Sequence, residues 1–324
     1  MYSSEEILAM INQGLDDLHL DRQPLGLYKP IRYVLGMGGK RVRPVLMLLV
    51  YNLYKDDLQK VLPVALGVET YHNYTLLHDD VMDRADVRRG HPCVHKVWNE
   101  NTAILSGDGM LVMAYQLVSQ CQPECLKEVL DLFTQTALEI GEGQQYDVDF
   151  EQRMDVRPEE YVEMIRLKTS VLLACAMKLG AIMAGMPEKD AGLMYGIGES
   201  VGLAFQLQDD MLDVYGDYET FGKRIGGDIL CNKKTYMLIK AIEGANSEQR
   251  AELERWLTAA DYDEEEKISA VKALYDSIGV REICQNLINE YFKKAQSLLD
   301  EVSLPIEKKQ VLWQYILTLL GRKS

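Results

Sequence analysis

Apolar residues recur every three to four positions through most of this chain, a spacing that predicts helices. The first helix follows Ser3, with Glu6 three residues later as in a capping box, and runs to about residue 18. Prolines and glycines mark most later boundaries. The other expected helices are a short segment punctuated by Pro24 and Pro30, an apolar helix after Gly36, Gly38 and Gly39, and helices at about 56–83, 101–119, 123–149, 158–180, from 187 onward and throughout 233–320.

Strand signals are weak by comparison. The sequence shows no sustained alternation with a period of two, no run of hairpin signals and no repeat at a solenoid period. Residues 84–100 and 216–232 are polar and are predicted to be loops. We therefore expect an all-α protein, built as one large helical bundle that forms a single domain over residues 1–324.

Composition narrows the possible partners. Of the 324 residues, 47% are hydrophobic and 26% charged, and the net charge of −15 argues against nucleic-acid binding. The sequence has no uninterrupted apolar run of membrane-spanning length and no signal-like start, so we do not expect an integral membrane protein. The six cysteines lack zinc spacing, which is typical of free thiols in a reducing, cytoplasmic setting. Any site for an anionic substrate must therefore be locally basic or loaded with metal.

Two aspartate clusters stand out within the apolar helices. Asp79, Asp80 and Asp83 form one DDxxD motif, and a second lies about 130 residues later. Positions i and i+4 share a helix face, where like charges repel each other. Two motifs that each place like charges on one helix face favour a bound cation. Because all these ligands are oxygen atoms, they point to a hard ion such as Mg²⁺. The second cluster comprises Asp209, Asp210 and Asp213.

From its GGKRVRP segment through its KKTY segment, the chain resembles the trans-isoprenyl diphosphate synthases, whose signature is this pair of motifs. The resemblance implies a helical bundle with a deep central cavity and the two Asp clusters facing each other across its mouth. It also implies two or three Mg²⁺ ions, a homodimer, and head-to-tail condensation of isopentenyl diphosphate with an allylic diphosphate.

Basic residues supply the rest of the expected site. Lys40 and Arg43 are predicted to lie one turn apart at the start of an apolar helix, and the GMGGKR segment lacks the P-loop pattern. The resemblance assigns Lys40, Arg43 and His72 to isopentenyl diphosphate. It also assigns Arg88 to the allylic diphosphate and Arg89 to isopentenyl diphosphate, in accord with the bidentate geometry of arginine.

The resemblance also places residues around the second cluster. Lys168 lies within an apolar helix, where an unpaired charge is costly. By resemblance Lys168 contacts the allylic diphosphate and Thr169 lies near the reacting carbons. Gln206, Lys223 and Lys233 match further site positions, although a shift of one residue would select Lys234 in place of Lys233.

The expected reaction ionises the allylic diphosphate, adds the alkene of isopentenyl diphosphate and loses a proton to the departing diphosphate. Two alternatives stay open. A terpene cyclase shares the fold class and a first DDxxD, but it needs neither the second DDxxD nor an isopentenyl site. A non-catalytic subunit or scaffold would not need to keep these residues.

Product length is predicted from positions preceding the first motif. Tyr74 lies five residues before Asp79, and Tyr71 lies about one turn earlier on the same helix. Each is expected to act as a floor under the growing chain. An aromatic Tyr74 beside the small Thr75, with no insertion in DDVMD, resembles geranylgeranyl diphosphate synthases of archaeal type. We therefore predict a product of fifteen to twenty carbons, farnesyl or geranylgeranyl diphosphate, and favour twenty.

Overall fold

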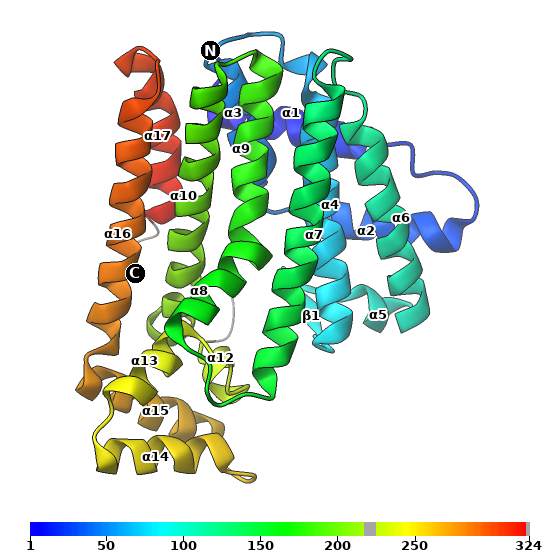
Figure 1. Ribbon diagram of the computed structural model, residues 1–324. Coiled ribbons are helices and arrows are strands. Elements are labelled where there is room, and N and C mark those ends of the chain that lie inside the picture. Colours follow the sequence, from blue (N-terminus) through cyan, green and yellow to red (C-terminus); the bar gives the residue numbers. More distant parts are fainter. Residues whose placement is uncertain (217–224, 322–324) are drawn as a thin grey trace. The chain divides into compact units, whose positions relative to one another are not determined.

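A computed structural model of the chain describes residues 1–216 and 225–321, and it is predominantly helical (Figure 1). The predicted all-α class is confirmed. Contacts divide the chain into two compact units, which are described separately below. Unit 1 contains residues 1–135 and 175–195, and unit 2 contains residues 136–174 and 196–324. The single domain over residues 1–324 stays a prediction.

Unit 1 is built from the N-terminal helices. Helix α4 packs against α6, while α3 packs on α4 and α2 on α6. The first helix has the predicted capping box between Ser3 and Glu6. The elements are α1 (Ser4–Asp16), α2 (Leu25–Gly36), α3 (Val42–Asn52), η1 (Leu58–Lys60), α4 (Leu62–Met82), β1 (Val87–Arg88), β2 (His91–Pro92), α5 (Val94–Val97) and α6 (Glu100–Val118).

Two boundaries in unit 1 differ from the sequence prediction. The helix expected from Asp56 begins at Leu62, so Pro63 sits in the first turn, where the missing N–H of proline costs nothing. The segment 84–100, predicted to be a loop, contains a short antiparallel hairpin and helix α5. Strands of two residues are too short to give a period-two signal, which explains why the pattern missed them.

Unit 2 holds the C-terminal helices and an apolar core around Leu207, Met237 and Tyr275. Helix α13 packs against α15 and α16, and α12 packs against α15. The remaining elements, three of which extend across both units, are α7 (Leu126–Glu151), α8 (Pro158–Ile165), a π-helical segment η2 (Arg166–Ser170), α9 (Val171–Ala184), α10 (Glu188–Tyr215), α12 (Gly227–Leu230), α13 (Tyr236–Gly244), α14 (Ser247–Thr258), α15 (Glu264–Ile278), α16 (Val280–Glu301) and α17 (Ile306–Leu320).

One continuous helical run, Pro158–Ala184, is long and apolar enough to cross a membrane, with a mean hydropathy of 1.5. Within the most apolar 18-residue stretch of this run, 78% is buried inside the protein. Core helices of globular proteins meet the same criterion, because their side chains face protein on most sides. The burial of this run matches a core helix.

Candidate functional site

Three carboxylates lie at the C-terminal end of helix α4. Asp79 and Asp80 lie in its last turn, and Asp83 is the C-cap residue. Negative charge is unfavourable there, because the terminal carbonyl groups already carry partial negative charge. Asp80 is buried, Asp79 is partly exposed and Asp83 is exposed. A cation bound at this end of α4 would offset the electrostatic cost.

The chain supplies one such cation itself. Arg88 donates to Oδ1 of Asp80 from both Nε and Nη2, at 2.9 and 2.6 Å. Its Nη2 also lies 3.8 Å from Oδ2 of Asp79. Asp80 therefore acts here as an acceptor for Arg88, while Asp79 and Asp83 are the more exposed carboxylates of the cluster.

Arg88 and Arg89 are adjacent in the chain, but a tight turn sends their side chains to different partners. Val87 pairs with Pro92 and Arg88 with His91, so Arg89 and Gly90 form the two-residue loop of the hairpin. Their φ angles are 52° and 78°, as two-residue hairpin loops require. Arg88 turns to the Asp cluster, whereas Arg89 donates from Nη1 to the carbonyl of Gly38 at 2.5 Å and to Oδ1 of Asn73 at 3.2 Å.

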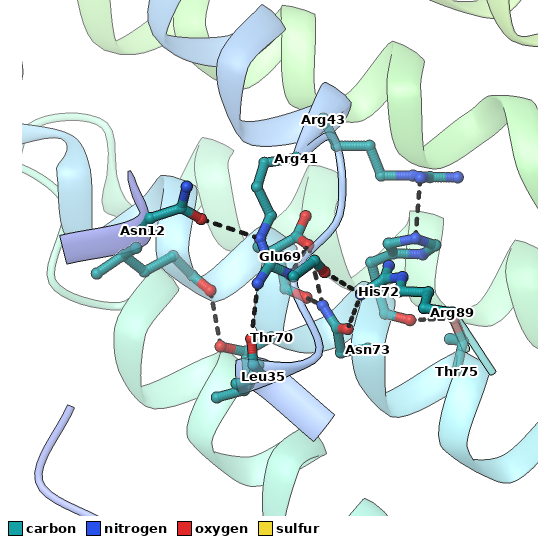
Figure 2. Close-up of polar contacts among 12 residues, drawn as sticks. Asn12, Leu35, Arg41, Arg43, Glu69, Thr70, His72, Asn73, Thr75 and Arg89 are labelled. Carbon is teal, nitrogen blue, oxygen red and sulfur yellow. Dashed lines mark hydrogen bonds and ion pairs between the residues drawn. The ribbon is translucent and has the colours of Figure 1, made fainter. Parts of the chain in front are cut away.

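The glycine-rich segment before α3 is anchored by Arg41 (Figure 2). Arg41 donates to Oε1 of Glu69 at 2.8 Å and to the carbonyl of Leu35 at 2.6 Å, and its Nε lies 3.4 Å from Oδ1 of Asn12. Glu69 Oε1 also accepts from Nδ2 of Asn73 at 3.0 Å. Through Asn73 this buried acid is linked to Arg89, so one carboxylate ties the glycine segment, α4 and the hairpin together.

Lys40 and Arg43 do not share a helical turn, contrary to the sequence prediction. Arg41 is the N-cap of α3 and has a φ of 49°. Lys40 therefore precedes the helix, and Arg43 lies inside its first turn. The left-handed residue between them redirects the chain, so the regular helical spacing does not apply to this pair.

Arg43 and His72 form a partly buried pair within the basic cluster. Nη1 of Arg43 lies 3.1 Å from Nε2 of His72, and because a guanidinium can only donate, His72 must accept as neutral imidazole. Burial, and then the charges of four arginines beginning with Arg43, hold the pKa of His72 well below its ordinary value. Burial lowers the pKa of Arg43 to about 10, and its Nε has no hydrogen-bond partner among the described residues. This excess of buried donors fits an anionic ligand.

In unit 2, the second cluster lies in α10. Asp210 is buried and accepts hydrogen bonds from the hydroxyl of Tyr161 and from Nε2 of Gln206, the latter at 3.0 Å. Burial, and then the charge of Asp228, raise the pKa of Asp210 to about 7. Oδ2 of Asp213 accepts from the backbone N–H of Asp228 at 3.0 Å. Asp209 is partly exposed.

A π-helical segment presents the Lys-Thr pair. Thr169 donates to Oε1 of Gln206 at 3.2 Å, which continues the hydrogen-bond chain to Asp210. Lys168 Nζ lies 2.6 Å from Oδ2 of Asp147 on α7. Helix α7 comes so close that a Cβ on Gly143 would stand 2.3 Å from the backbone nitrogen of Lys168. π-Helical turns often occur at functional sites, where they redirect side chains.

The structure describes only one of the two lysines, Lys223 and Lys233, that are expected to follow the second Asp cluster. Lys223 lies outside the described residues. Nζ of Lys233 lies 4.0 Å from Oδ1 of Asp228, whereas Lys234 donates to the carbonyl of Asn232 at 3.1 Å. Lys234 is thus used in a local backbone contact, so we keep Lys233 as the candidate ligand.

The predicted chain-length residues belong to an aromatic cluster in unit 1. The ring of Tyr71 lies 5.4 Å from that of Tyr74 and 5.3 Å from that of Phe133, between centroids. Tyr74 also contacts His78, at 4.8 Å. Tyr71 is buried, whereas Tyr74 and Thr75 are partly exposed. Tyr74 is therefore the tyrosine whose side chain could meet a ligand without displacing core atoms.

Several residues that hold these side chains escaped the sequence prediction. They are Arg41, Glu69, Asn73, Tyr161, Asp147 and Asp228. Glu69 carried a usable signal, because an acid inside an apolar helix must be paired when buried. The others are joined to their partners only by the fold.

The residues fit a hard divalent ion. Within residues 1–216 and 225–321, no three His, Cys, Asp or Glu side chains converge closely enough to enclose a metal. Mg²⁺ is commonly bound through one or two carboxylates, with waters and substrate phosphate completing its shell. The carboxylates of Asp79 and Asp83 in unit 1, and separately that of Asp209 in unit 2, match that ligand chemistry.

Comparisons with known proteins agree on one family. The sequence profile described as polyprenyl synthetase matches residues 25–275. The chain is 38% identical over 293 residues to a geranylgeranyl diphosphate synthase of Methanosarcina mazei, covering 90% of this chain and 88% of the relative. It is 39% identical over 279 residues to a short chain isoprenyl diphosphate synthase of Methanocaldococcus jannaschii, covering 86% and 84%.

Solved structures show the same likeness. A crystal structure of a geranylgeranyl pyrophosphate synthase is 43% identical, matches with a TM-score of 0.95 and covers all of both chains. A geranylgeranyl pyrophosphate synthase of Corynebacterium glutamicum, complexed with isoprenyl diphosphate and magnesium, is 26% identical, with a TM-score of 0.86 over 99% of this chain and 98% of the other.

Proposed function

The chain belongs to the polyprenyl synthetase family, and we propose that it is a short-chain trans-prenyltransferase that joins isopentenyl diphosphate head-to-tail to an allylic diphosphate. The observation that carries this proposal is the coexistence of the Arg43–His72 basic pair with two carboxylate clusters. A terpene cyclase would need only one diphosphate site, and the relatives above are named as synthases.

The basic cluster of unit 1 would hold isopentenyl diphosphate. Lys40, Arg43 and Arg89 would contact its oxygens, and neutral His72 would orient Arg43 through the 3.1 Å contact. Fixed cations bind a diphosphate strongly when they need no rearrangement on binding. The Glu69 network supplies that rigidity, because it anchors Arg89 and the glycine segment from inside the protein.

The allylic diphosphate would be held by Arg88, Lys168 and Lys233, with Mg²⁺ ligated by Asp79, Asp83 and Asp209, and Asp213 acting directly or through water. Mg²⁺ would neutralise diphosphate charge. Asp80 and Asp210 would take part mainly by holding Arg88 and Gln206 in place, since each is buried against those donors. Thr169 would lie near the reacting carbons, held by Gln206.

The proposed product is geranylgeranyl diphosphate, with Tyr74 as the floor of the chain-binding space. Support comes from the exposure of Tyr74 and from the relatives named geranylgeranyl diphosphate synthases. We also propose that the protein is a cytoplasmic homodimer. Helix α6 carries two exposed apolar side chains, Leu105 and Val112, seven residues apart and hence on one face.

Product analysis tests the proposal. The purified protein would be incubated with isopentenyl diphosphate, Mg²⁺ and dimethylallyl, geranyl or farnesyl diphosphate in turn, and the dephosphorylated alcohols separated by chromatography. Geranylgeraniol as the main alcohol is the expected result. Diphosphate release that does not require isopentenyl diphosphate would instead identify a cyclase. Light scattering would report the oligomeric state.

A further inference from the structure

Lys267, on α15 of unit 2, is buried, with 1% of its surface exposed. Its ammonium donates to Oδ1 of Asn232 at 2.7 Å, lies 3.5 Å from the carbonyl of Leu230 and stands 4.3 Å from the ring centroid of Tyr262. Lysine is seldom buried, since removing its charge from water is costly. The ammonium of Lys267 therefore contacts the C-terminal end of α12 and the residues that follow it.

Asn232 is the link between Lys267 and the site. Its φ of 52° is left-handed, a conformation that few residues other than glycine adopt without support. Its side chain is fixed from two sides, because Nδ2 donates to the carbonyl of Leu257 at 3.1 Å while Oδ1 accepts from Lys267. The next residue is Lys233, so the conformation of Asn232 affects where the Lys233 side chain points, together with the contact of its Nζ with Oδ1 of Asp228 at 4.0 Å.

The other end of this short segment is held by the second Asp motif. The backbone N–H groups of Gly226 and Asp228 donate to the carbonyl and carboxylate of Asp213, at 2.6 and 3.0 Å. Gly226 also packs against α15, since a Cβ there would stand 2.6 Å from Cδ1 of Ile268. Successive residues of α15 thus touch both ends of segment 226–233, and Figure 1 shows α12 beside this helix.

The packing of this segment is close but leaves one small gap. A cavity of about 10 Å³ is lined by Asp228, Asn232, Lys233 and Lys267, among other residues, and a space of that size holds about one water molecule. Polar contacts therefore act together with packing to hold the segment. The Lys267–Asn232 hydrogen bond is therefore the contact best placed to fix the direction of Lys233.

We propose that Lys267 is a positioning residue for the allylic diphosphate, acting through Asn232 to aim the ammonium of Lys233. The inference rests on the proposed function, which gives Lys233 its ligand. Lys267 would not touch substrate. It would lower the cost of ordering Lys233, because a preformed cation binds diphosphate without first losing conformational freedom.

The test is a double-mutant cycle. Lys267→Met keeps the apolar stem and removes the ammonium, so the KM for farnesyl diphosphate should rise about tenfold, the effect of losing roughly one charged hydrogen bond. The KM for isopentenyl diphosphate should stay unchanged, because its proposed ligands lie on other elements. In a Lys233→Met background, Lys267→Met should have little further effect, as expected for residues acting through one contact.

Matched variants separate positioning from general damage. Lys272→Met removes another lysine of α15, whose Nζ lies 5.2 Å from the ring centroid of Tyr215, and should leave the KM for farnesyl diphosphate unchanged. Asn232→Gly allows the positive φ but lacks the Oδ1 acceptor, so it should reproduce the defect even if Lys267→Met fails to fold. Lys267→Arg should restore part of the affinity.

Three results would overturn the proposal: an unchanged KM for farnesyl diphosphate in Lys267→Met, an equal rise for both substrates, or full additivity with Lys233→Met. Its failure is distinct from failure of the proposed function, which would appear as a wild-type protein that forms no prenyl product. In that event, calorimetry would compare the affinities of wild type and Lys267→Met for inorganic diphosphate in the presence of Mg²⁺. Equal affinities would reject the positioning role.

Discussion

Arg41 and Glu69 form a buried ion pair, with 2.8 Å between Nη1 and Oε1 and 2% of each side chain exposed. Arg41 belongs to the glycine segment and Glu69 to α4, and both elements carry residues of the proposed isopentenyl site. The pair also lies among other cations, since the charge of Glu69 acts on both Arg43 and Arg89. It therefore joins the stability of unit 1 to the geometry of the proposed anion site.

Breaking this pair from one side should be costly. Glu69→Gln or Arg41→Met would leave a buried charge without its partner, which typically lowers the free energy of unfolding by about 3–5 kcal/mol. Urea titration would measure the loss. The double variant Arg41→Met/Glu69→Leu should be less destabilised than either single variant, because no buried charge is left unpaired.

The exposed pair Arg32–Asp21, with side chains 50% and 82% exposed, provides the control. Arg32→Met should change stability little, since exposed ion pairs contribute little. The double variant of Arg41 and Glu69 should also bind isopentenyl diphosphate more weakly, because Asn73 then loses its carboxylate acceptor and holds Arg89 less firmly. Unaltered stability in both single variants would contradict the role assigned to the pair.

His72 should make stability fall in acid. Its folded pKa lies well below the ordinary 6.5, so below that pH the unfolded chain binds a proton that the folded chain does not. As the pH falls below 6.5, this group should lower the free energy of unfolding by about 1.4 kcal/mol per pH unit. Above pH 6.5 the histidine is neutral in both states, so it should cause no change with pH. His72→Gln should remove the slope.

Asp210 acts in the opposite sense. Its pKa is raised from 3.8 to about 7, so its contribution to stability is lost as pH rises through that range. The useful quantity is therefore the difference between wild type and His72→Gln, measured by denaturant titration at each pH. A pH-independent difference would mean that the imidazole titrates normally in the folded protein.

The carboxylates with greater exposure should control turnover. Asp79→Ala and Asp209→Ala should each lower kcat by about 100-fold or more, the typical effect of removing a central electrostatic group. Both side chains are partly exposed, so circular dichroism and thermal unfolding should stay close to wild type. Near-normal turnover at saturating Mg²⁺ in either variant would show that the carboxylate is not a metal ligand.

The two tyrosines should separate product length from stability. Tyr74→Ala should lengthen the product by at least one five-carbon unit at little cost in stability, because Tyr74 is partly exposed. Tyr71→Ala should lower the free energy of unfolding by about 3–5 kcal/mol, since it leaves a cavity beside Phe133. Chromatography of the alcohols and urea titration would measure these effects. An unchanged product from the double variant would remove both as the floor.

Helix content and motif placement could be predicted because they depend on local pattern. Periodicity placed His72 and the first Asp cluster on one helix, and the structure has both in α4. The start of α4 was misplaced because acidic residues favour many helix starts, while Pro63 fixes the actual one. The spacing of Lys40 and Arg43 was wrong because the left-handed Arg41 interrupts the regular geometry.

Residues joined through the fold were harder to predict. Arg41 meets Glu69 across 28 positions, and Lys267 meets Asn232 across 35. A charged residue in a sequence gives no indication of whether it will be buried or of which distant partner it will find. The supporting contacts therefore had to come from the structure, whereas the candidate ligands could be proposed from motifs.

The π-helical segment Arg166–Ser170 bears on how this gene could change length. A π turn holds one residue more than an α turn, as an inserted residue would produce. Deleting one residue there would restore an ordinary helical turn and change the directions of the side chains within the segment, while the helix beyond it would keep its phase. Lys168 and Thr169 would then turn away from Asp147 and Gln206. Single-codon deletions should consequently be tolerated in surface connections but selected against across this helix.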